Sequence, residues 1–226
     1  MQCNICENTI PAFIGTDKTC PVCHCRQVHR ALIKKFGKDI IKKETRTLHI
    51  GPHVALVRYI EKEIAAHTDS AYIPIDPRPG KNTIVPIDIT EPGLKIHECD
   101  IVICLGVLDE IKDEAGAMGN ILNSMKAGAT LLFTVPLKAG ATDRGYETEE
   151  ENSHAEAKTK EKKHVKVLKT EDRETRFGGK NKFRKYGSDD ILDFIIAYGF
   201  TAKFTKVAAD ASIGTEALDI IEATKQ

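Results

Sequence analysis

The chain has 226 residues, of which 41% are hydrophobic, so it can bury one sizeable core and a small appendage. Its 33 basic and 33 acidic side chains cancel, which excludes a general electrostatic attraction to nucleic acid or to a membrane surface. No apolar run approaches the length of about 18 residues that indicates a membrane-spanning helix, and the N-terminus lacks a secretory signal pattern. We therefore expect a cytoplasmic protein with no membrane partner.

Five of the seven cysteines lie within the first 25 residues. Cys3 and Cys6 form one C-x2-C pair, and Cys20 and Cys23 form a second pair after 13 intervening residues. Each pair makes a tight turn that directs two thiolates at one ion, and two pairs complete the tetrahedral shell that zinc prefers. Because four thiolates leave no open coordination position, the spacing predicts a structural zinc site rather than a catalytic one.

The segment around these cysteines has almost no apolar core of its own, so metal binding is expected to supply most of its folding free energy. A redox dithiol and simply buried cysteines are the alternatives. His24 and Cys25 are spare; either one can replace a ligand, but the sequence favours a role as neighbours.

After the cysteines, helical and strand patterns alternate. Helices are expected at residues 26–43, 54–64, 110–126 and 188–200, with Ser188 as an N-cap, and strands at residues 48–50, 72–76, 83–88, 100–105, 129–136, 201–207 and 216–225. This alternation predicts an α/β domain with a parallel central sheet, and the short connection between the last two strands predicts an antiparallel hairpin at its edge. We expect a zinc ribbon at residues 1–27 and this domain at residues 28–226.

Two segments differ from this alternation. Residues 138–176 form a charged insertion, interpreted either as a lid over the carboxyl ends of the strands or as a solvated insertion. Residues 176–186, RFGGKNKFRKY, combine basic and aromatic side chains without an acid. That pattern fits a site for nucleic acid or another anionic substrate, and it also fits a soluble loop with anchoring aromatics.

Three features are expected to meet over the carboxyl ends of the first strands, where an open α/β sheet binds its ligands. Gly51 closes the first strand and permits close approach of a ligand. Asp76 ends the second predicted strand, where its carboxylate can accept both hydroxyls of a ribose. Asp88 ends the third, and with Ile89 it can bracket an adenine edge. Aspartates at strand ends also cap turns without any ligand, which is the alternative.

The loop after the first strand reads G-P-H-V-A-L and lacks the glycines that cradle a pyrophosphate. Pro52 removes an amide donor, and His53 would crowd phosphate groups. S-adenosylmethionine carries adenine, a ribose and an amino acid tail but no phosphate, so it fits this loop better than a dinucleotide does.

In this order the motifs resemble class I S-adenosylmethionine-dependent methyltransferases, specifically the subgroup with an N-terminal zinc ribbon. The matching stretches are CPVC (20–23), HRAL (29–32), LHIGP (48–52), DIT (88–90), CLGVLDEI (104–111), MKAGATLLFTVP (125–136) and KYGSDDILDFIIAYGF (185–200). The resemblance implies a Rossmann-like, mostly parallel seven-stranded sheet with an antiparallel C-terminal hairpin. It also implies a cofactor site formed by Ile50, Gly51, Pro52, Asp76, Asp88, Ile89, Cys104, Leu105 and Gly106.

The chain departs from the family pattern where Asp109 and Glu110 replace a usual Glu-His pair. These two carboxylates and Tyr146 are candidate general bases, but the first two are equally well explained as helix N-terminal acids, so no catalytic residue is assigned. The leading hypothesis is a methyltransferase of unknown acceptor that works by in-line displacement. The alternatives are a catalytically degenerate binding module that acts through the zinc ribbon and the basic loop, and a nicotinamide-dependent oxidoreductase, which the missing glycines disfavour.

Overall fold

The structure, a computed structural model, describes residues 1–67, 69–78, 84–144, 146–148, 165–167 and 182–226. The chain divides into two compact units. The first unit comprises residues 1–108, 113–135 and 192–226, and the second comprises residues 109–112 and 136–191. The boundary at residue 27 between a zinc ribbon and the rest of the chain stays a prediction.

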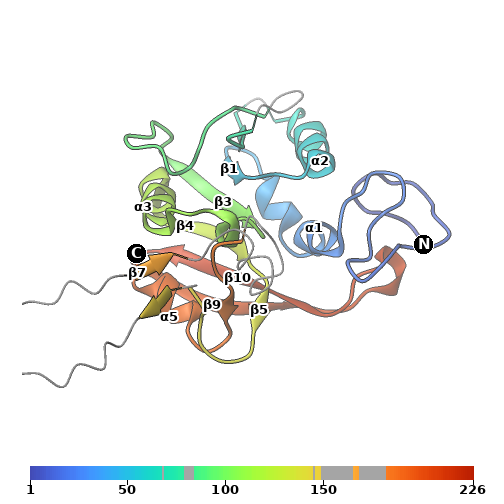
Figure 1. Ribbon diagram of the computed structural model, residues 1–226. Helices are drawn as coiled ribbons and strands as arrows, with labels where there is room; N and C mark the ends of the chain where they lie inside the picture. Colours follow the sequence, from blue (N-terminus) through green and yellow to red (C-terminus); the bar gives the residue numbers. More distant parts are fainter. Residues whose placement is uncertain (68, 79–83, 145, 149–164, 168–181) are drawn as a thin grey trace, which may run out of the picture. The chain divides into compact units, whose positions relative to one another are not determined.

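A six-stranded sheet forms the centre of the first unit, in the order β2-β1-β3-β4-β10-β9 (Figure 1). The strands are β1 (Arg46–Ile50), β2 (Ala71–Ile75), β3 (Cys99–Leu105), β4 (Met125–Thr134), β9 (Phe200–Val207) and β10 (Leu218–Lys225). The first four strands are parallel, whereas β10 runs antiparallel to both β4 and β9. The predicted α/β architecture with an antiparallel C-terminal hairpin is therefore confirmed.

The sheet has six named strands rather than the predicted seven. Of the predicted strand at residues 83–88, residue 83 lies outside the described part of the chain, and residues 84–88 do not form a strand: Val85 makes one isolated parallel bridge with Ile75. Pro86, the next residue, carries no N–H group and cannot donate to a ladder, which limits pairing at this edge. The prediction of a third strand at this place was wrong.

In the described part of the chain the helices are α1 (Gln27–Ile40), α2 (Val54–Ile64), α3 (Glu114–Ser124) and the short α5 (Ile191–Ile196), with single 3-10 turns at Leu108–Glu110 and Ala211–Ile213. Leu32, Phe36 and Ile40 of α1 are buried at the helical spacing that the sequence shows. Among the described residues, no helix is long and apolar enough to cross a membrane.

Several helix boundaries differ from the prediction: α1, α3 and α5 end earlier than expected, at Ile40, Ser124 and Ile196, and α3 and α5 also begin later. The third helix begins at Glu114 rather than residue 110, because the Asp113 carboxylate caps it by accepting a hydrogen bond from the Gly116 amide at 2.9 Å. The last helix begins at Ile191, so Ser188 is not its N-cap; the Ser188 hydroxyl instead donates to the Asp189 carboxylate at 3.0 Å.

Two small sheets lie in the described part of the second unit. Strand β5 (Leu137–Lys138) pairs in parallel with β8 (Tyr186–Gly187), and β6 (Tyr146–Thr148) pairs antiparallel with β7 (Val165–Val167). Most of the predicted insertion at residues 138–176 lies outside the described residues.

The main hydrophobic core joins the cysteine-rich segment to the sheet. Its buried members include Cys3 and Cys20, Leu32 of α1, and Ile103 and Leu132 of the sheet. In Figure 1 the N-terminal segment, in blue, lies beside the connection between β9 and β10, in red. The cysteine-rich segment therefore packs on the same unit as the sheet rather than standing apart from it.

Candidate functional site

The two cysteine pairs have the same local geometry. The Glu7 amide donates to the Cys3 carbonyl at 2.8 Å, and the His24 amide donates to the Cys20 carbonyl at 3.0 Å. Glu7 and His24 both have positive φ angles, of 61° and 59°. Each turn closes in this way just after its second cysteine, which leaves both thiols of the pair on the inner side of the turn.

The sulfur atoms of Cys3, Cys6, Cys20 and Cys23 all lie within 4.8 Å of one another. The Cys3–Cys23 and Cys6–Cys20 sulfur distances are both 3.8 Å. Zinc–sulfur bonds of about 2.3 Å place the sulfurs of a tetrahedral site about 3.8 Å apart, so the donor set fits zinc in both type and spacing. These distances are much longer than the sulfur–sulfur bond of a disulfide, about 2.05 Å, and all four cysteines are free in this structure. Neither His24 nor Cys25 belongs to this ligand group.

The carboxyl ends of β1, β2 and β3 lie side by side, because Ile50 is in register with Ile75 on one side and with Cys104 on the other. Gly51 and Gly106 follow β1 and β3 directly, and Asp76 follows β2. The strand order reverses around β1, which is the switch point where such sheets bind their ligands.

Gly51 is constrained by its surroundings as well as by its backbone. Its φ angle is +57°, and a Cβ atom built at this position would lie 2.7 Å from a methyl group of Val107. Gly106 also has a positive φ angle, of +66°, but no atom lies within 4 Å of a Cβ built there. The close approach at Gly51 is therefore made by a side chain of the protein itself.

The Asp76 carboxylate is engaged by Arg78. It accepts hydrogen bonds from the Arg78 amide and from Nε, both at 2.9 Å, and from Nη2 at 2.8 Å. These bonds lower the pKa of Asp76, although burial opposes the shift. The Arg78 side chain is 79% exposed, so this partner can leave without opening the core.

Asp88 and Ile89 lie in a turn that rests on α3. One Asp88 carboxylate oxygen accepts from the Thr90 amide at 2.9 Å and from its hydroxyl at 2.8 Å. The side-chain amide of Asn120 donates to the Ile89 carbonyl at 2.7 Å. Asp88 thus caps its own turn, which is the arrangement that the alternative interpretation described.

The other predicted cofactor residues differ in exposure. Ile50, Cys104 and Leu105 are buried in the sheet, whereas Pro52 and Gly106 are partly exposed. The Gly106 amide donates to the Thr134 carbonyl at 2.7 Å. Backbone and glycine surfaces, rather than long side chains, are what this part of the chain presents.

Two buried histidines, His29 and His49, and the partly exposed His53 lie on or beside the same loop. The His53 ring caps α2 by accepting from the Ala55 amide at 3.3 Å and lies 4.9 Å from the ring of His29. Nδ1 of His49, on β1, lies 2.7 Å from the Tyr72 hydroxyl. Burial lowers the pKa of His49 to about 3 and that of His29 to about 2. The rings of His29 and His49 are therefore uncharged near neutral pH and serve as structural groups.

In the second unit, Asp109 and Glu110 share one cation. Lys182 Nζ lies 2.5 Å from Asp109 Oδ2 and 2.9 Å from Glu110 Oε1. Burial raises the pKa of Asp109, against the opposing effect of Lys182. The Oδ1 atom of Asp109 is buried and has no hydrogen-bond partner among the residues that the structure describes. The side chain of Tyr146, the third candidate base, lies outside the described part.

The basic segment at residues 176–186 is only partly described, from Lys182 onward. Lys182 is held by the two carboxylates, and Arg184 is buried and donates from Nη2 to the Lys112 carbonyl at 3.0 Å. These two cations therefore make contacts within the chain. The prediction of an anionic substrate at this segment stays a prediction.

Arg30 has a central place that the sequence reasoning missed. Its side chain is fully buried, and its guanidinium donates to carbonyl groups of the cysteine-rich segment and of the β9–β10 connection, namely those of Lys18, Cys25, Ile213 and Gly214. In the sequence, the only indication that Arg30 is important is its place in the HRAL stretch at residues 29–32, which resembles the methyltransferase pattern.

A groove of 460 Å³ lies between the cysteine turns and α2. Cys6 and Cys23 line it together with Val22, Val54 and Arg58. Val22 and Val54 are 52% and 39% exposed, so the walls of the groove carry apolar surface that faces solvent.

Comparison with known proteins gives matches among solved structures. The 1,6-didemethyltoxoflavin-N1-methyltransferase of Burkholderia thailandensis, solved with 1,6-didemethyltoxoflavin and S-adenosylhomocysteine, matches with a TM-score of 0.53 at 11% sequence identity; the match covers 88% of this chain and 76% of that one. An S-adenosylmethionine-dependent methyltransferase from Archaeoglobus fulgidus matches with a TM-score of 0.52 at 13% identity, over 88% of this chain and 93% of that one. No protein-family model and no curated protein sequence matches the chain.

These neighbours show which fold the chain has. It is the fold of class I S-adenosylmethionine-dependent methyltransferases, as the ordered motifs predicted, combined with an N-terminal cluster of four cysteines that is compatible with a zinc ribbon. Identities this low establish the fold alone.

Proposed function

We propose that the chain is an S-adenosylmethionine-dependent methyltransferase whose N-terminal cysteines bind a structural zinc ion. The observation that carries the proposal is the alignment of Gly51, Asp76 and Gly106 at the ends of three adjacent parallel strands, at the switch point of a methyltransferase fold. When bound, S-adenosylmethionine supplies an electrophilic methyl group for an in-line displacement.

The residues at these strand ends have separable roles in the proposal. Gly106 leaves backbone surface open along the amino acid tail of the cofactor, whereas Gly51 allows the turn to pack against Val107. The Asp76 carboxylate releases Arg78 and accepts hydrogen bonds from the ribose hydroxyls instead. Asp88 and Ile89 bracket the adenine edge. Proximity and exclusion of water supply most of the rate enhancement in such a reaction, so we assign no general base.

Calorimetric titration with S-adenosylhomocysteine and S-adenosylmethionine tests this proposal. Asp76→Ala should weaken binding about tenfold or more, since a hydrogen bond to a charged group contributes about 1.5–3 kcal/mol. Arg78→Ala should bind as tightly as the wild type or more tightly, because it frees the carboxylate. Absence of binding to both ligands would refute the proposal, and unchanged affinity in Asp76→Ala would refute the assigned site. NAD should give no heat.

The zinc proposal rests on the 3.8 Å sulfur spacings. The purified chain should contain one zinc ion per molecule by elemental analysis. Cys20→Ser should lose it, whereas Cys99→Ser, which alters a buried cysteine outside the ligand group, should retain it. Zinc retained at full occupancy in Cys20→Ser would contradict the assignment of the ligands.

The groove beside α2 favours a second candidate, a binding module without catalysis. Val22 and Val54 offer exposed apolar walls, and Arg58 offers a positive charge at the same groove. A partner protein segment with an aliphatic side chain next to a carboxylate matches this surface. An assay of methyl transfer distinguishes the two functions. If the chain binds the cofactor and methylates any acceptor, a purely binding role is contradicted.

A further inference from the structure

Arg30 is a buried cation whose partners, within the described residues, include no carboxylate. Its Nε donates to the Ile213 carbonyl at 2.6 Å, and its two terminal nitrogens donate to the carbonyls of Cys25, at 3.0 Å, and of Gly214, at 2.9 Å. The guanidinium carbon also lies 3.9 Å from the centre of the Phe13 ring. All of these partners are neutral, so they satisfy the donors without balancing the charge.

An unbalanced charge in a protein interior is strongly destabilising, because it has lost its hydration without gaining an opposite charge. Asp210, the carboxylate in the turn that Arg30 contacts, is paired with Lys34. The negative charge that remains available to Arg30 belongs to the cysteine cluster. Four thiolates around a divalent zinc ion leave a formal charge of about −2. A buried guanidinium is therefore electrostatically matched to the metal-bound cluster.

Cys25 lies between the Arg30 guanidinium and the cluster of four cysteines and contacts both. Arg30 Nη1 lies 3.5 Å from the Cys25 sulfur, and the Cys25 sulfur lies 3.5 Å from the Cys3 sulfur. The Cys25 thiol can donate its hydrogen to the Cys3 thiolate while its sulfur accepts from Arg30. Cys25 is fully buried and lies outside the group of four ligands, so it acts as a contact of that group rather than a member.

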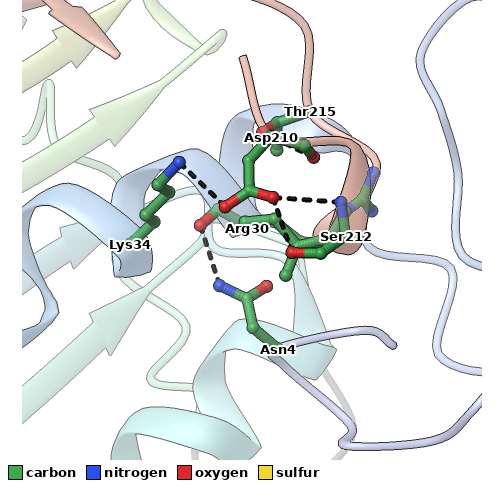
Figure 2. Close-up of polar contacts among 7 residues, drawn as sticks. Asn4, Arg30, Lys34, Asp210, Ser212 and Thr215 are labelled. Atoms are coloured by element: carbon green, nitrogen blue, oxygen red, sulfur yellow. Dashed lines mark hydrogen bonds and ion pairs between the residues drawn. The ribbon is translucent and has the colours of Figure 1, made fainter. Parts of the chain in front are cut away.

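Arg30 also holds the turn between β9 and β10, at residues 210–215. The Asp210 carboxylate closes this turn by accepting from the amide and hydroxyl of Ser212, and it forms an ion pair with Lys34 of α1 at 2.9 Å. Figure 2 shows these contacts beside Arg30, whose own carbonyl accepts from the Asn4 side chain at 3.1 Å. A cation on α1 thus contacts both the cysteine-rich segment and a turn 183 residues away.

We propose that Arg30, acting through Cys25, is the internal counter-charge of the zinc centre and makes zinc binding and closure of the 210–215 turn depend on each other. Arg30 and Cys25 are positioning residues: neither touches the metal. The inference rests on the proposed zinc site. Because coupling free energies are reciprocal, loss of zinc loosens the turn and loss of the Arg30 charge weakens zinc binding.

The first test measures zinc affinity by competition with a chromogenic chelator. Arg30→Met should bind zinc about 10- to 100-fold more weakly than the wild type, the usual effect of removing an outer contact of a metal ligand. Arg30→Lys should bind more tightly than Arg30→Met, because it retains the charge although it loses the forked hydrogen bonds. Lys35→Met, which removes an exposed charge from the same helix, is the matched control and should not change the affinity.

The second test separates a neighbour from a ligand. Cys25→Ala loaded with Co²⁺ should keep the absorption spectrum of a four-thiolate site at one ion per chain, with weaker binding. A spectrum typical of fewer than four thiolate ligands would show that Cys25 is itself a ligand. It would overturn the proposal that Arg30 acts on the zinc centre through Cys25.

The third test needs no variant. Hydrogen exchange of the wild type should become at least about tenfold faster at residues 210–215 after zinc removal, as local opening would predict, while exchange in the turn at residues 88–91 stays unchanged. Equal exchange with and without zinc, or equal zinc affinity in Arg30→Met and Lys35→Met, would overturn the proposal. A wild type that takes up no zinc would overturn the metal site as well, and so the two failures are distinguishable.

Discussion

Gly51 shows at the scale of one residue how a strand end limits its own sequence. The position needs glycine twice, once for the positive φ angle and once for the Val107 methyl group at 2.7 Å from a built Cβ. Gly106 has the first requirement without the second. The pair therefore separates backbone strain from steric contact.

We expect Gly51→Ala to lower the free energy of unfolding more than Gly106→Ala does. Each substitution lowers the free energy of unfolding by about 1 kcal/mol, because alanine must adopt a left-handed backbone conformation. At Gly51 the steric contact with Val107 adds roughly 1–3 kcal/mol to this loss. Urea unfolding of both variants measures the difference. Combining Gly51→Ala with Val107→Ala should recover part of the extra loss; equal losses in the two single variants would contradict this explanation.

His49 illustrates the effect of burial on a titrating residue. The pKa of His49 is lowered from 6.5 to about 3 in the folded chain. As the pH falls below 6.5, the unfolded chain takes up a proton at His49 before the folded chain does. The contribution to stability is therefore present above pH 6.5 and is lost progressively as the pH falls from 6.5 toward 3.

His49→Gln should accordingly be less sensitive to acid than the wild type. Its free energy of unfolding should fall less steeply between about pH 6 and pH 5, by up to about 1.4 kcal/mol per pH unit, which is the contribution of one proton. Denaturant unfolding at several pH values gives the slopes. His97→Gln, at an exposed position, is the control and should keep the slope of the wild type. Identical slopes in all three proteins would show that His49 does not titrate in this way.

At the scale of one element, α3 begins where its cap is, rather than where its apolar pattern starts. Asp113 provides the cap, and the sequence between residues 110 and 113 forms the end of a 3-10 turn and a bend instead. The remaining boundaries of the helices and strands mostly follow the periodicity, because apolar spacing decides which face is buried.

Asp113→Ala should lower the free energy of unfolding by about 0.5–2 kcal/mol, because it leaves the Gly116 amide without its acceptor at the helix start. Asp113→Ser should recover most of this loss, since a hydroxyl can accept the same bond. Thermal unfolding compares the three proteins. A loss that serine does not recover would assign the effect to charge instead of capping.

At the scale of the whole molecule, the cysteine-rich segment shares its core with the sheet. Cys3, Leu32 and Ile103 belong to one buried cluster. Metal binding is thus expected to stabilise the first unit as a whole, because a ligand that binds only the folded state adds its binding free energy to that state.

Zinc removal should therefore lower the midpoint of the main unfolding transition in differential scanning calorimetry. Adding a chelator to the wild type should shift this transition downward, and adding zinc back should restore it. Cys20→Ser, which already lacks a ligand, should show no further shift with chelator. A transition unaffected by chelation would mean that the segment folds independently of its metal.

The sequence alone determined those features that depend on local spacing. The two C-x2-C pairs define a four-sulfur cluster, and alternating apolar periods define an α/β sheet with a C-terminal hairpin, because turn geometry and the burial of one face act within a few residues. The order of the motifs identified the fold.

Only the tertiary structure decided what depends on residues far apart in the chain. Val107 explains why position 51 needs glycine, and Arg30 reaches Ile213 across 183 positions. The third predicted strand, at residues 83–88, forms only a single bridge with Ile75, at Val85. Local periodicity predicts which face of a helix or strand is buried. Which other element covers that face depends on the packing of the whole chain.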